Sequence, residues 1–277
     1  MIATEFEYHR PDTVQEAVEL FGRLSTEGKK PIYYGGGTEI ITDARLGKVE
    51  PDAVIDLKTI PECRVLDRRD GELVIGCGLT LAEVCEAAPW ALLTAAAGRV
   101  GDHTTRCKIT LGGNLAGKLP YREAVLPLLL ADSSHAVIAG PQGLRRARFA
   151  DVFDRTLHLN PQEFLAQVTV SEGELGWPFV CVKKTRLDWV DYPLFTLAAI
   201  QVDRQVHVAC SGLVAYPFRS GAMDRALNER TTPLAERVEA AAHLVPAPVV
   251  SDIHGTDAYR LFVFKRTLAD TVAKLGG

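Results

Sequence analysis

Two glycine-rich segments in the first half of the chain constrain its fold more than any other feature. Tyr34-Gly35-Gly36-Gly37-Thr38-Glu39 follows a short apolar run, as a loop after a strand would, and Thr110-Leu111-Gly112-Gly113-Asn114 places flexible amides beside a hydroxyl and a side-chain amide. Glycine lets backbone amides approach a ligand closely, and successive amides in a turn form a cradle for phosphate. Each segment alone is more often a tight turn or a helix cap. Two of them in one domain favour a dinucleotide whose diphosphate is held by main-chain amides.

Common nucleotide-binding and catalytic patterns are missing from the sequence. Neither glycine segment has the GxGxxG spacing or the lysine that follows the glycines of a P-loop. The six cysteines have no spacing typical of zinc or iron–sulfur sites, and we interpret them as small buried apolar residues. His103 and His254 are interpreted as polar loop residues. We therefore predict no catalytic residue and no metal ligand in this chain.

Charge and apolar content exclude several other classes of protein. The 277 residues include 31 basic and 35 acidic side chains, for a net charge of −4, whereas nucleic-acid binders are usually basic. The basic run 145–148 is interpreted as a solvated turn or strand edge. No apolar stretch reaches the roughly 18–20 residues that span a bilayer, and the N-terminal residues lack the apolar core of a signal peptide. We expect a cytoplasmic protein that binds neither membrane nor nucleic acid.

Helix and strand signals alternate along the chain, which predicts a mixed α and β architecture. Thr13 with Glu16, and Thr80 with Glu83, have the spacing of a capping box at the start of an apolar helix pattern. Turn-forming residues are frequent in the segment 160–178, which we interpret as a boundary region. Two domains are therefore expected, 1–168 and 169–277. Further elements are predicted as strands at 53–57, 72–77, 136–139, 179–185, 194–202 and 205–211, with a hairpin turn at 203–204, and as helices at 121–131, 232–244 and 257–275.

Five segments, in order along nearly the whole chain, resemble those of a known family. The first glycine segment is similar to the family's first FAD loop, and the second is similar to its T-[IL]-G-G-N loop. The segments 179–186 and 212–219, the latter ending in Pro-x-Arg, and the set Ser251-Asp252, Gly255 and Tyr259-Arg260 continue the likeness. The chain thus resembles the FAD-binding medium subunit of the molybdenum hydroxylases, the family of xanthine dehydrogenase and carbon monoxide dehydrogenase.

The resemblance implies an α+β fold and a position for FAD. The expected fold is a two-subdomain FAD-binding domain of the vanillyl-alcohol-oxidase type, followed by a smaller domain with a three-stranded antiparallel sheet and helices. Main-chain groups of 34–38 and of 112–114 would hold the diphosphate, with the side chains of Thr38 and Thr110 adding hydrogen bonds. The isoalloxazine ring would face the cleft between the domains.

Two further positions are carried over with departures from the family pattern. Many relatives have an aspartate nine residues after the asparagine of the second loop, and Glu123 stands at that offset with one more methylene. The stretch 119–123 departs from the common Pro-x-x-Asp form and is similar to a subgroup that acts on purines or on nicotinate. Either Lys183 or Lys184 takes the place of the family lysine near the flavin, although both also fit a solvated strand end. The cysteine spacing argues against the inserted iron–sulfur cluster that some relatives carry.

The implied function is electron transfer within a heterotrimer. A small iron–sulfur subunit would deliver electrons from a large molybdenum-cofactor subunit, and FAD would pass them to NAD⁺ as a hydride. The substrate, bound by another chain, is expected to be xanthine or a related N-heterocycle because of the likeness at 121–123. Two alternatives stay open: an assembly or maturation protein that has lost FAD, and a stand-alone flavin oxidase.

Overall fold

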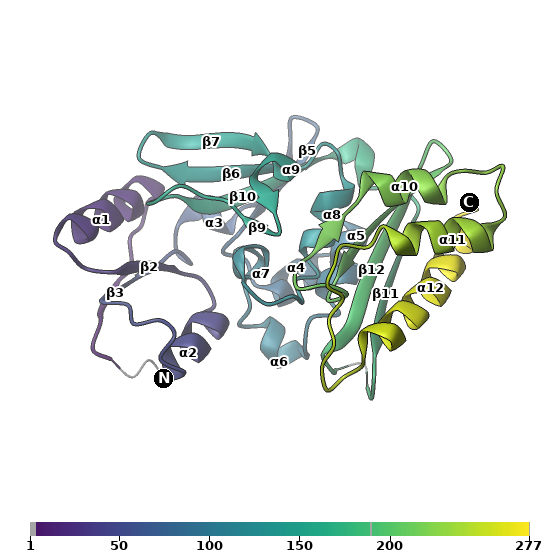
Figure 1. Cartoon of the computed structure of the whole chain (residues 1–277). Coiled ribbons are helices and arrows are strands. Elements are labelled where there is room, and N and C mark those ends of the chain that lie inside the picture. Colours follow the sequence, from purple (N-terminus) through teal and green to yellow (C-terminus); the bar gives the residue numbers. More distant parts are fainter. Residues whose placement is uncertain (1–3, 189, 277) are drawn as a thin grey trace. The chain divides into compact units, whose positions relative to one another are not determined.

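The computed structural model describes residues 4–188 and 190–276 (Figure 1). By their internal contacts these residues form two compact units that interleave along the sequence. The first unit holds the chain up to Ala87, His103–Gly117 and Ser133–Glu172, and the second holds Ala88–Asp102, Lys118–Asp132 and the chain from Gly173 on. Two helical segments of the first half of the chain therefore pack with the C-terminal half. The division at 168/169, drawn from the sequence as two consecutive domains, stays a prediction.

A small parallel sheet begins the first unit. Its strands β1 (Glu7–His9), β3 (Ala53–Asp56) and β2 (Pro31–Tyr34) lie in the order β1-β3-β2, and β3 pairs in parallel with both neighbours. Parallel strands require crossovers, which α1 (Val14–Thr26) and α2 (Thr38–Arg45) supply. The Thr13 cap predicted for α1 is present, because the Glu16 amide donates to Thr13 Oγ1 at 3.1 Å, while the Glu16 carboxylate accepts at 2.9 Å from the amide of Asp12, one residue before the N-cap.

The second sheet of the first unit is antiparallel and has five strands. In spatial order they are β4 (Leu66–Arg69), β5 (Glu72–Gly76), β10 (Phe164–Ser171), β6 (His135–Gly140) and β7 (Gly143–Arg148). The predicted strands at 72–77 and 136–139 are confirmed as β5 and β6. The boundary region interpreted at 160–178 contains β10, the central strand, which is buried over most of its length, and the two units also divide within this region, between Glu172 and Gly173. The alternation of apolar residues with Gln167, Thr169 and Ser171 was available in the sequence, but turn residues on either side obscured it.

Shorter elements complete the first unit, and the basic run lies at its edge. Arg145 pairs with Glu163 at 2.7 Å and Arg146 with Glu72 at 2.9 Å on the edge strand β7, which confirms the prediction of a solvated strand edge. Charged side chains on an edge strand also oppose pairing with other chains. The short elements are α3 (Pro61–Arg64), α4 (Leu81–Ala87), α6 (His103–Arg106), α7 (Leu111–Ala116), α9 (Phe149–Val152), β8 (Phe153–Asp154), β9 (Thr156–Leu157) and the 3₁₀ turn Glu172–Glu174.

The second unit is built on an antiparallel sheet of four strands. Its order is β11 (Phe179–Thr185), β12 (Pro193–Val202), β13 (Gln205–Ser211) and β14 (Phe218–Arg219). The expected sheet of three strands is corrected here, because β14 adds a fourth through the pair Cys210 and Phe218. A strand of two residues is too short to show any periodicity in the sequence. The predicted β12–β13 hairpin is confirmed, and its turn residues Asp203 and Arg204 have positive φ of 48° and 65°.

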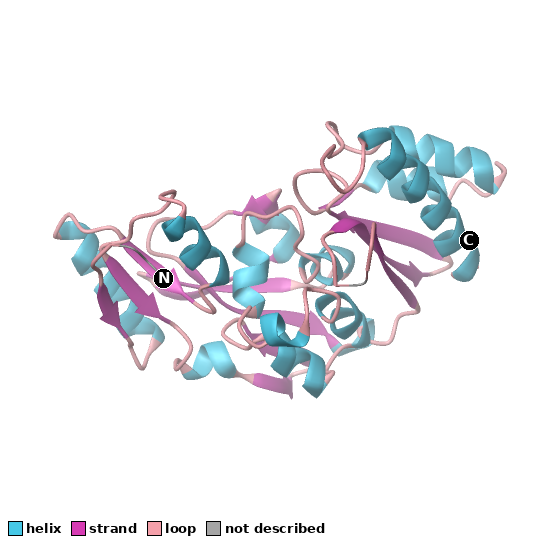
Figure 2. Ribbon diagram, turned by 90° about the horizontal axis from the view of Figure 1, so that it is seen from below, coloured by secondary structure: helices cyan, strands magenta, loops and turns pink. Residues whose placement is uncertain are grey.

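Helices cover this sheet (Figure 2). The helices α10 (Gly221–Leu227), α11 (Leu234–His243) and α12 (Asp257–Lys274) share one apolar core with the sheet, and Phe195, Leu197 and Val208 contribute to it. The helices α5 (Ala91–Ala97) and α8 (Val125–Leu130) also contact its strands. The predicted helix 121–131 is shorter than expected, because Pro127 lies in its first turn, where no amide hydrogen bond is lost.

Neither a membrane span nor a metal cluster is found within residues 4–188 and 190–276. No helix there combines the length and the apolar character needed to cross a bilayer. No group of three or more His, Cys, Asp or Glu side chains there could hold a metal ion.

Candidate functional site

The fold brings the two glycine segments into contact within the first unit. The first segment follows β2, and its glycines pack directly on the residues that lead into the second. A Cβ atom on Gly35 would lie 2.6 Å from Thr110 Oγ1, and one on Gly36 would lie 1.6 Å from the carbonyl oxygen of Lys108. Side chains larger than hydrogen are therefore excluded at both positions. The two loops thus pack backbone against backbone: Gly35, Gly36 and Gly112 are half-buried and Gly37 and Thr110 are buried, whereas Thr38 and Gly113 are exposed.

The first loop offers backbone amides at the start of a helix. Gly37 is the N-cap of α2 with a φ of 71°, and no side chain caps the helix. Within the described residues, the amides of Gly35, Gly36, Gly37 and Thr38 donate to no protein acceptor. Glu39 lies in the first turn of α2. Uncapped amides at a helix N-terminus, together with the helix dipole, favour a bound anion such as a phosphate group.

The second loop is held differently, because its amides already have acceptors. The Gly112 amide donates to the Cys77 carbonyl at 2.8 Å, and the Asn114 amide donates to the Thr110 carbonyl at 2.9 Å. The Gly113 amide donates to Thr110 Oγ1 at 3.1 Å as the cap of α7. A threonine hydroxyl that accepts one hydrogen bond still has its own proton to donate. The Thr110 hydroxyl therefore keeps a proton to donate while it caps α7, and the residue is 1% exposed, beneath Gly35.

The second loop is anchored through a capping box. Thr80 and Thr110 form a β-bridge, and the Glu83 amide donates to Thr80 Oγ1 at 3.2 Å while the Thr80 amide donates to Glu83 Oε2 at 2.7 Å. This confirms the capping box predicted for 80–83. Arg64 pairs with Glu83 and also donates to the Gly78 carbonyl at 3.1 Å. Burial raises the pKa of Glu83, but hydrogen bonds from Arg64 and Thr80 outweigh it and lower the pKa from 4.5 to about 2.

Replacement of Glu83 by glutamine is expected to make the protein less sensitive to acid. Because the folded-state pKa is lowered, the Glu83 carboxylate stabilises the fold above pH 4.5, and this contribution is lost as the pH falls towards 2. At neutral pH the E83Q variant should lose about 1 kcal/mol of stability, as for other lost caps. Thermal unfolding at several pH values between 7 and 2 measures both effects. The control is Glu86→Gln, an exposed position of the same helix. Equal acid dependence of E83Q and the unmodified protein would show that Glu83 carries no part of it.

Glu123 lies in the second unit as a buried carboxyl group. It is 2% exposed, and its Oε1 accepts a hydrogen bond from the Thr196 hydroxyl at 3.4 Å. Its Oε2 has no hydrogen-bond partner among the described residues. Burial raises the pKa of Glu123, and the charge of Lys183 opposes that rise. A buried carboxyl oxygen without a partner is costly, so the position suits a ligand that brings a hydroxyl donor.

The structure separates the two lysines of β11. Lys183 Nζ donates to the Arg99 carbonyl at 2.8 Å, and its charge reaches Glu123. Lys184 points to the other face of the sheet, because neighbouring residues of a strand alternate. Lys183 therefore shares a face with Glu123, whereas Lys184 does not. The assignment of either lysine to a ligand stays a prediction.

One charged group beside the first loop was not singled out in the sequence. Lys58 Nζ donates to the Gly35 carbonyl at 3.0 Å and to both carboxylate oxygens of Asp56, at 2.8 and 2.7 Å. Burial raises the pKa of Asp56, and hydrogen bonds from Lys58 and Tyr8 lower it further than burial raises it. The pairing of the strands could have pointed to Lys58. Strands β2 and β3 are parallel with Tyr34 opposite Asp56, so polar residues just after β3 lie beside the loop after β2.

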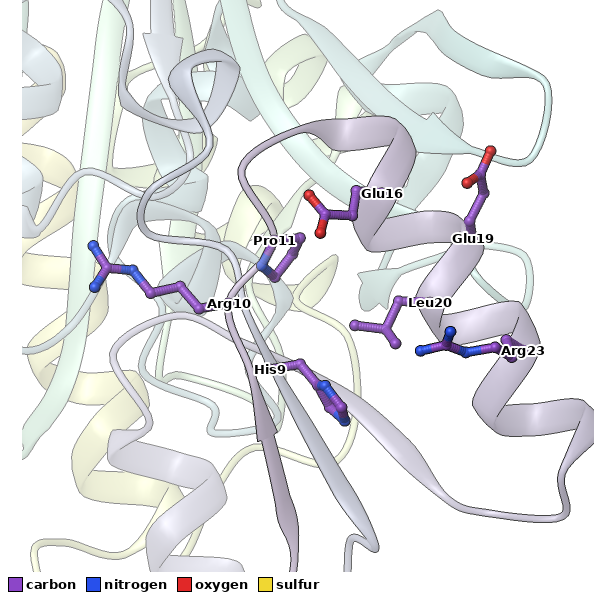
Figure 3. Close-up of a pocket in the computed structure, with 7 residues that line it drawn as sticks. All are labelled: His9, Arg10, Pro11, Glu16, Glu19, Leu20 and Arg23. Carbon is purple, nitrogen blue, oxygen red and sulfur yellow. The ribbon is translucent and has the colours of Figure 1, made fainter.

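A cavity of about 420 Å³ lies elsewhere on the first unit. Figure 3 shows residues of the α1 helix on one side of it, and on the other His9 at the end of β1 with Arg10 and Pro11 after it. Its lining mixes basic and acidic side chains, and none of the glycine-loop residues takes part. The lining residues are His9, Arg10, Pro11, Glu16, Glu19, Leu20 and Arg23.

Comparisons with known proteins agree on one family and one fold. The family described as FAD binding domain in molybdopterin dehydrogenase matches residues 4–171. The carbon monoxide dehydrogenase medium chain of Hydrogenophaga pseudoflava is 27% identical over 274 residues, which cover 94% of this chain and 93% of that one. The nicotinate dehydrogenase FAD-subunit of Eubacterium barkeri is 26% identical over 180 residues, 61% of this chain and 60% of that one. A solved carbon monoxide dehydrogenase of Hydrogenophaga pseudoflava, lacking the Mo-pyranopterin moiety of its cofactor, superposes with a TM-score of 0.83 at 24% identity over 99% of this chain and 98% of that one. The predicted fold class is thereby confirmed.

Proposed function

Because the chain belongs to the family of FAD-binding domains of the molybdopterin dehydrogenases, we propose that it passes electrons from the iron–sulfur clusters of a partner subunit through FAD to NAD⁺. Membership makes it an FAD-binding medium subunit of a molybdenum hydroxylase, and thus a subunit of an oxidoreductase. FAD, when bound, supplies the two-electron chemistry that links single-electron carriers to hydride transfer. The protein holds and orients the cofactor, in keeping with the lack of a predicted catalytic acid or base.

The observation that carries the proposal is the contact between the two glycine loops. A methyl group at Gly36 would overlap the Lys108 carbonyl, so the backbones approach as closely as glycine permits. The amides of 35–38 and the Thr110 hydroxyl are donors for the two phosphates of FAD. Amides of 112–114 would have to exchange existing hydrogen bonds to take part. These donors fit a diphosphate, because none of them carries a negative charge that would repel it. The amides at the start of α2 also lie at the positive end of the helix dipole.

In the second unit, Glu123 is proposed to receive a hydroxyl group of FAD. Its Oε2 has no partner within the described residues, and a ribityl or ribose hydroxyl would satisfy it. Lys183 is proposed as the family lysine because it lies on the same face of the sheet as Glu123. Its position keeps a positive charge close to that carboxyl group.

Partners and substrate are proposed from the relatives. One is named a medium chain and another an FAD-subunit, which supports a complex with a small iron–sulfur subunit and a large molybdenum-cofactor subunit. An N-heterocycle is proposed as substrate of the complex, because one relative is a nicotinate dehydrogenase and the stretch 119–123 resembles subunits that act on purines or nicotinate. Xanthine is the first compound to assay. A stand-alone oxidase would purify without other chains.

The test begins with the absorbance spectrum of the purified chain and identification of the cofactor released by acid. Equimolar FAD is expected, and anaerobic NADH should bleach the flavin bands, since hydride transfer from FAD to NAD⁺ runs in both directions. Isolation from the native cell should recover two further chains, one with iron–sulfur absorbance. Bound FAD that NADH does not reduce would rule out NAD⁺ as the acceptor. A colourless chain that no added FAD reconstitutes would overturn the electron-transfer role.

A further inference from the structure

We propose that Lys58 is a positioning residue that sets the first glycine loop for the diphosphate of FAD. The inference rests on the proposed binding of FAD between the glycine loops. Lys58 follows β3, and its side chain is 36% exposed. It reaches across to the backbone of the neighbouring loop, where its ammonium group meets the Gly35 carbonyl at 3.0 Å.

The ammonium group acts on the loop and not on the ligand, because its donors are all engaged. A lysine ammonium has three N–H donors. Here they meet three oxygens: Oδ1 and Oδ2 of Asp56, at 2.8 and 2.7 Å, and the Gly35 carbonyl. Asp56 is 5% exposed and is held in turn by the Tyr8 hydroxyl at 2.5 Å. The buried Asp56 carboxylate thus holds the ammonium group of Lys58 in place, and the same group donates a hydrogen bond to the loop at Gly35.

The bond to Gly35 determines where the next amide points. A trans peptide is planar, so its C=O and N–H point in opposite directions. With the Gly35 carbonyl turned towards Lys58, the N–H of Gly36 in the same peptide points away from Lys58. Glycine on both sides makes this peptide easy to rotate, because neither residue has a Cβ to oppose other backbone angles. The lysine therefore selects, from several accessible orientations of this peptide, the one in which the Gly36 amide points away from Lys58.

The same lysine supports the far end of the loop through Tyr34. Its Nζ lies 4.6 Å from the centre of the Tyr34 ring. That ring packs so tightly under Gly37 that a Cβ atom on Gly37 would lie 2.1 Å from the tyrosine hydroxyl oxygen. Lys58 and Tyr34 together form the base of the loop from Gly35 to Gly37. Loss of the lysine would release both contacts at once.

The experiment compares Lys58→Met with Lys48→Met in the flavin-free full chain. Both changes remove one positive charge, but Lys48 is an exposed residue whose ion pair with Asp43 spans 3.9 Å. FAD binding is followed by quenching of flavin fluorescence, and ADP, a probe that contains the diphosphate, is measured by displacement of FAD. K58M should bind both FAD and ADP about tenfold more weakly, the size expected for a lost hydrogen bond to a charged group. K48M should bind both as the unmodified protein does.

A second variant separates positioning from a general loss of structure. Lys58→Arg keeps the charge and donors that can reach the Gly35 carbonyl, so it should recover FAD affinity to within about threefold. If K58M does not fold, the FAD affinity of K58R alone tests whether a positive charge at this position sets the loop. Unchanged FAD affinity in K58M, weaker FAD with unchanged ADP, or a folded K58R that loses FAD affinity would each overturn the inference. Failure of the unmodified chain to bind FAD would instead overturn the proposed function, so the two failures are distinct.

Discussion

Replacement of Gly36 by alanine is expected to give a protein that purifies without FAD. The added Cβ would lie 1.6 Å from the Lys108 oxygen, 2.7 Å from the Lys108 carbonyl carbon and 3.3 Å from the Thr110 nitrogen. All three are backbone atoms, which cannot turn aside as a side chain can, so one loop must move away from the other. Overpacking of this kind costs about 1–3 kcal/mol of stability. Loss of two charge-assisted hydrogen bonds to the diphosphate would weaken FAD binding about a hundredfold or more.

The matched control for this prediction is Gly176→Ala. Gly176 has a negative φ, and a Cβ atom added there would have no atom within 4 Å, so its variant should keep both FAD and thermal stability. Flavin content after purification and FAD titration of the flavin-free chain are the two measurements. A G36A protein that holds FAD as tightly as the control would show that the close contact of the loops does not build the site.

Local features of the fold could be predicted from the sequence because a few neighbouring residues determine them. The Thr13 cap and the capping box at Thr80 form as predicted, since a threonine hydroxyl accepts the amide three residues later and a glutamate carboxylate accepts an amide at the helix start. The hairpin turn at 203–204 is likewise determined by residues that are adjacent in the sequence. These patterns require no knowledge of what lies across the core.

Features set by distant parts of the chain could not be predicted in this way. The central strand β10 carries an alternating pattern, because the apolar residues Ala166, Val168 and Val170 alternate with Gln167, Thr169 and Ser171, but that pattern does not show that Gln167 and Thr169 are buried as well. The order β4-β5-β10-β6-β7 places this strand between hairpins that precede it in sequence. Strand β14 has only two residues, which is too few to show the alternation of apolar and polar residues that identifies a strand.

The candidate site shows the same division between local and distant information. The glycines were singled out from the sequence, but their contact depends on Gly36 meeting Lys108, which no local pattern encodes. Lys58 was missed because its role depends on the parallel register of β2 and β3. Glu123 came from a family resemblance, and only the structure shows that it is buried with one oxygen unpartnered among the described residues.

The C-terminal motif Ser251-Asp252, Gly255 and Tyr259-Arg260 has a structural role within the second unit. Arg260 is fully buried in α12 and pairs with Asp252 at 2.6 Å. Its guanidinium also donates to the carbonyl of Leu194, to that of Gly212 at 3.3 Å and to that of Gly255 at 3.4 Å. One side chain therefore joins the start of β12, the segment after β13 and the turn before α12. Burial raises the pKa of Asp252, but hydrogen bonds from the backbone and from Arg260 lower it overall.

Replacement of Arg260 by methionine is expected to cost about 1–3 kcal/mol of stability, because buried carbonyl groups lose their donor, whereas the partner Asp252 is 29% exposed and stays hydrated. Methionine fills much of the volume but removes the donor of the Leu194 and Gly212 carbonyl groups, so the loss comes from unsatisfied polar groups and not from a cavity. The Asp252 carboxylate keeps the hydrogen bond from the His254 amide at 2.8 Å. Calorimetry should show the unfolding transition lowered by about 5 °C. Arg266→Met is the control, because Arg266 is exposed on the same helix and lies 4.9 Å from the Phe262 ring. Equal transitions for the two variants would mean that the Arg260 contacts do not hold these three segments together.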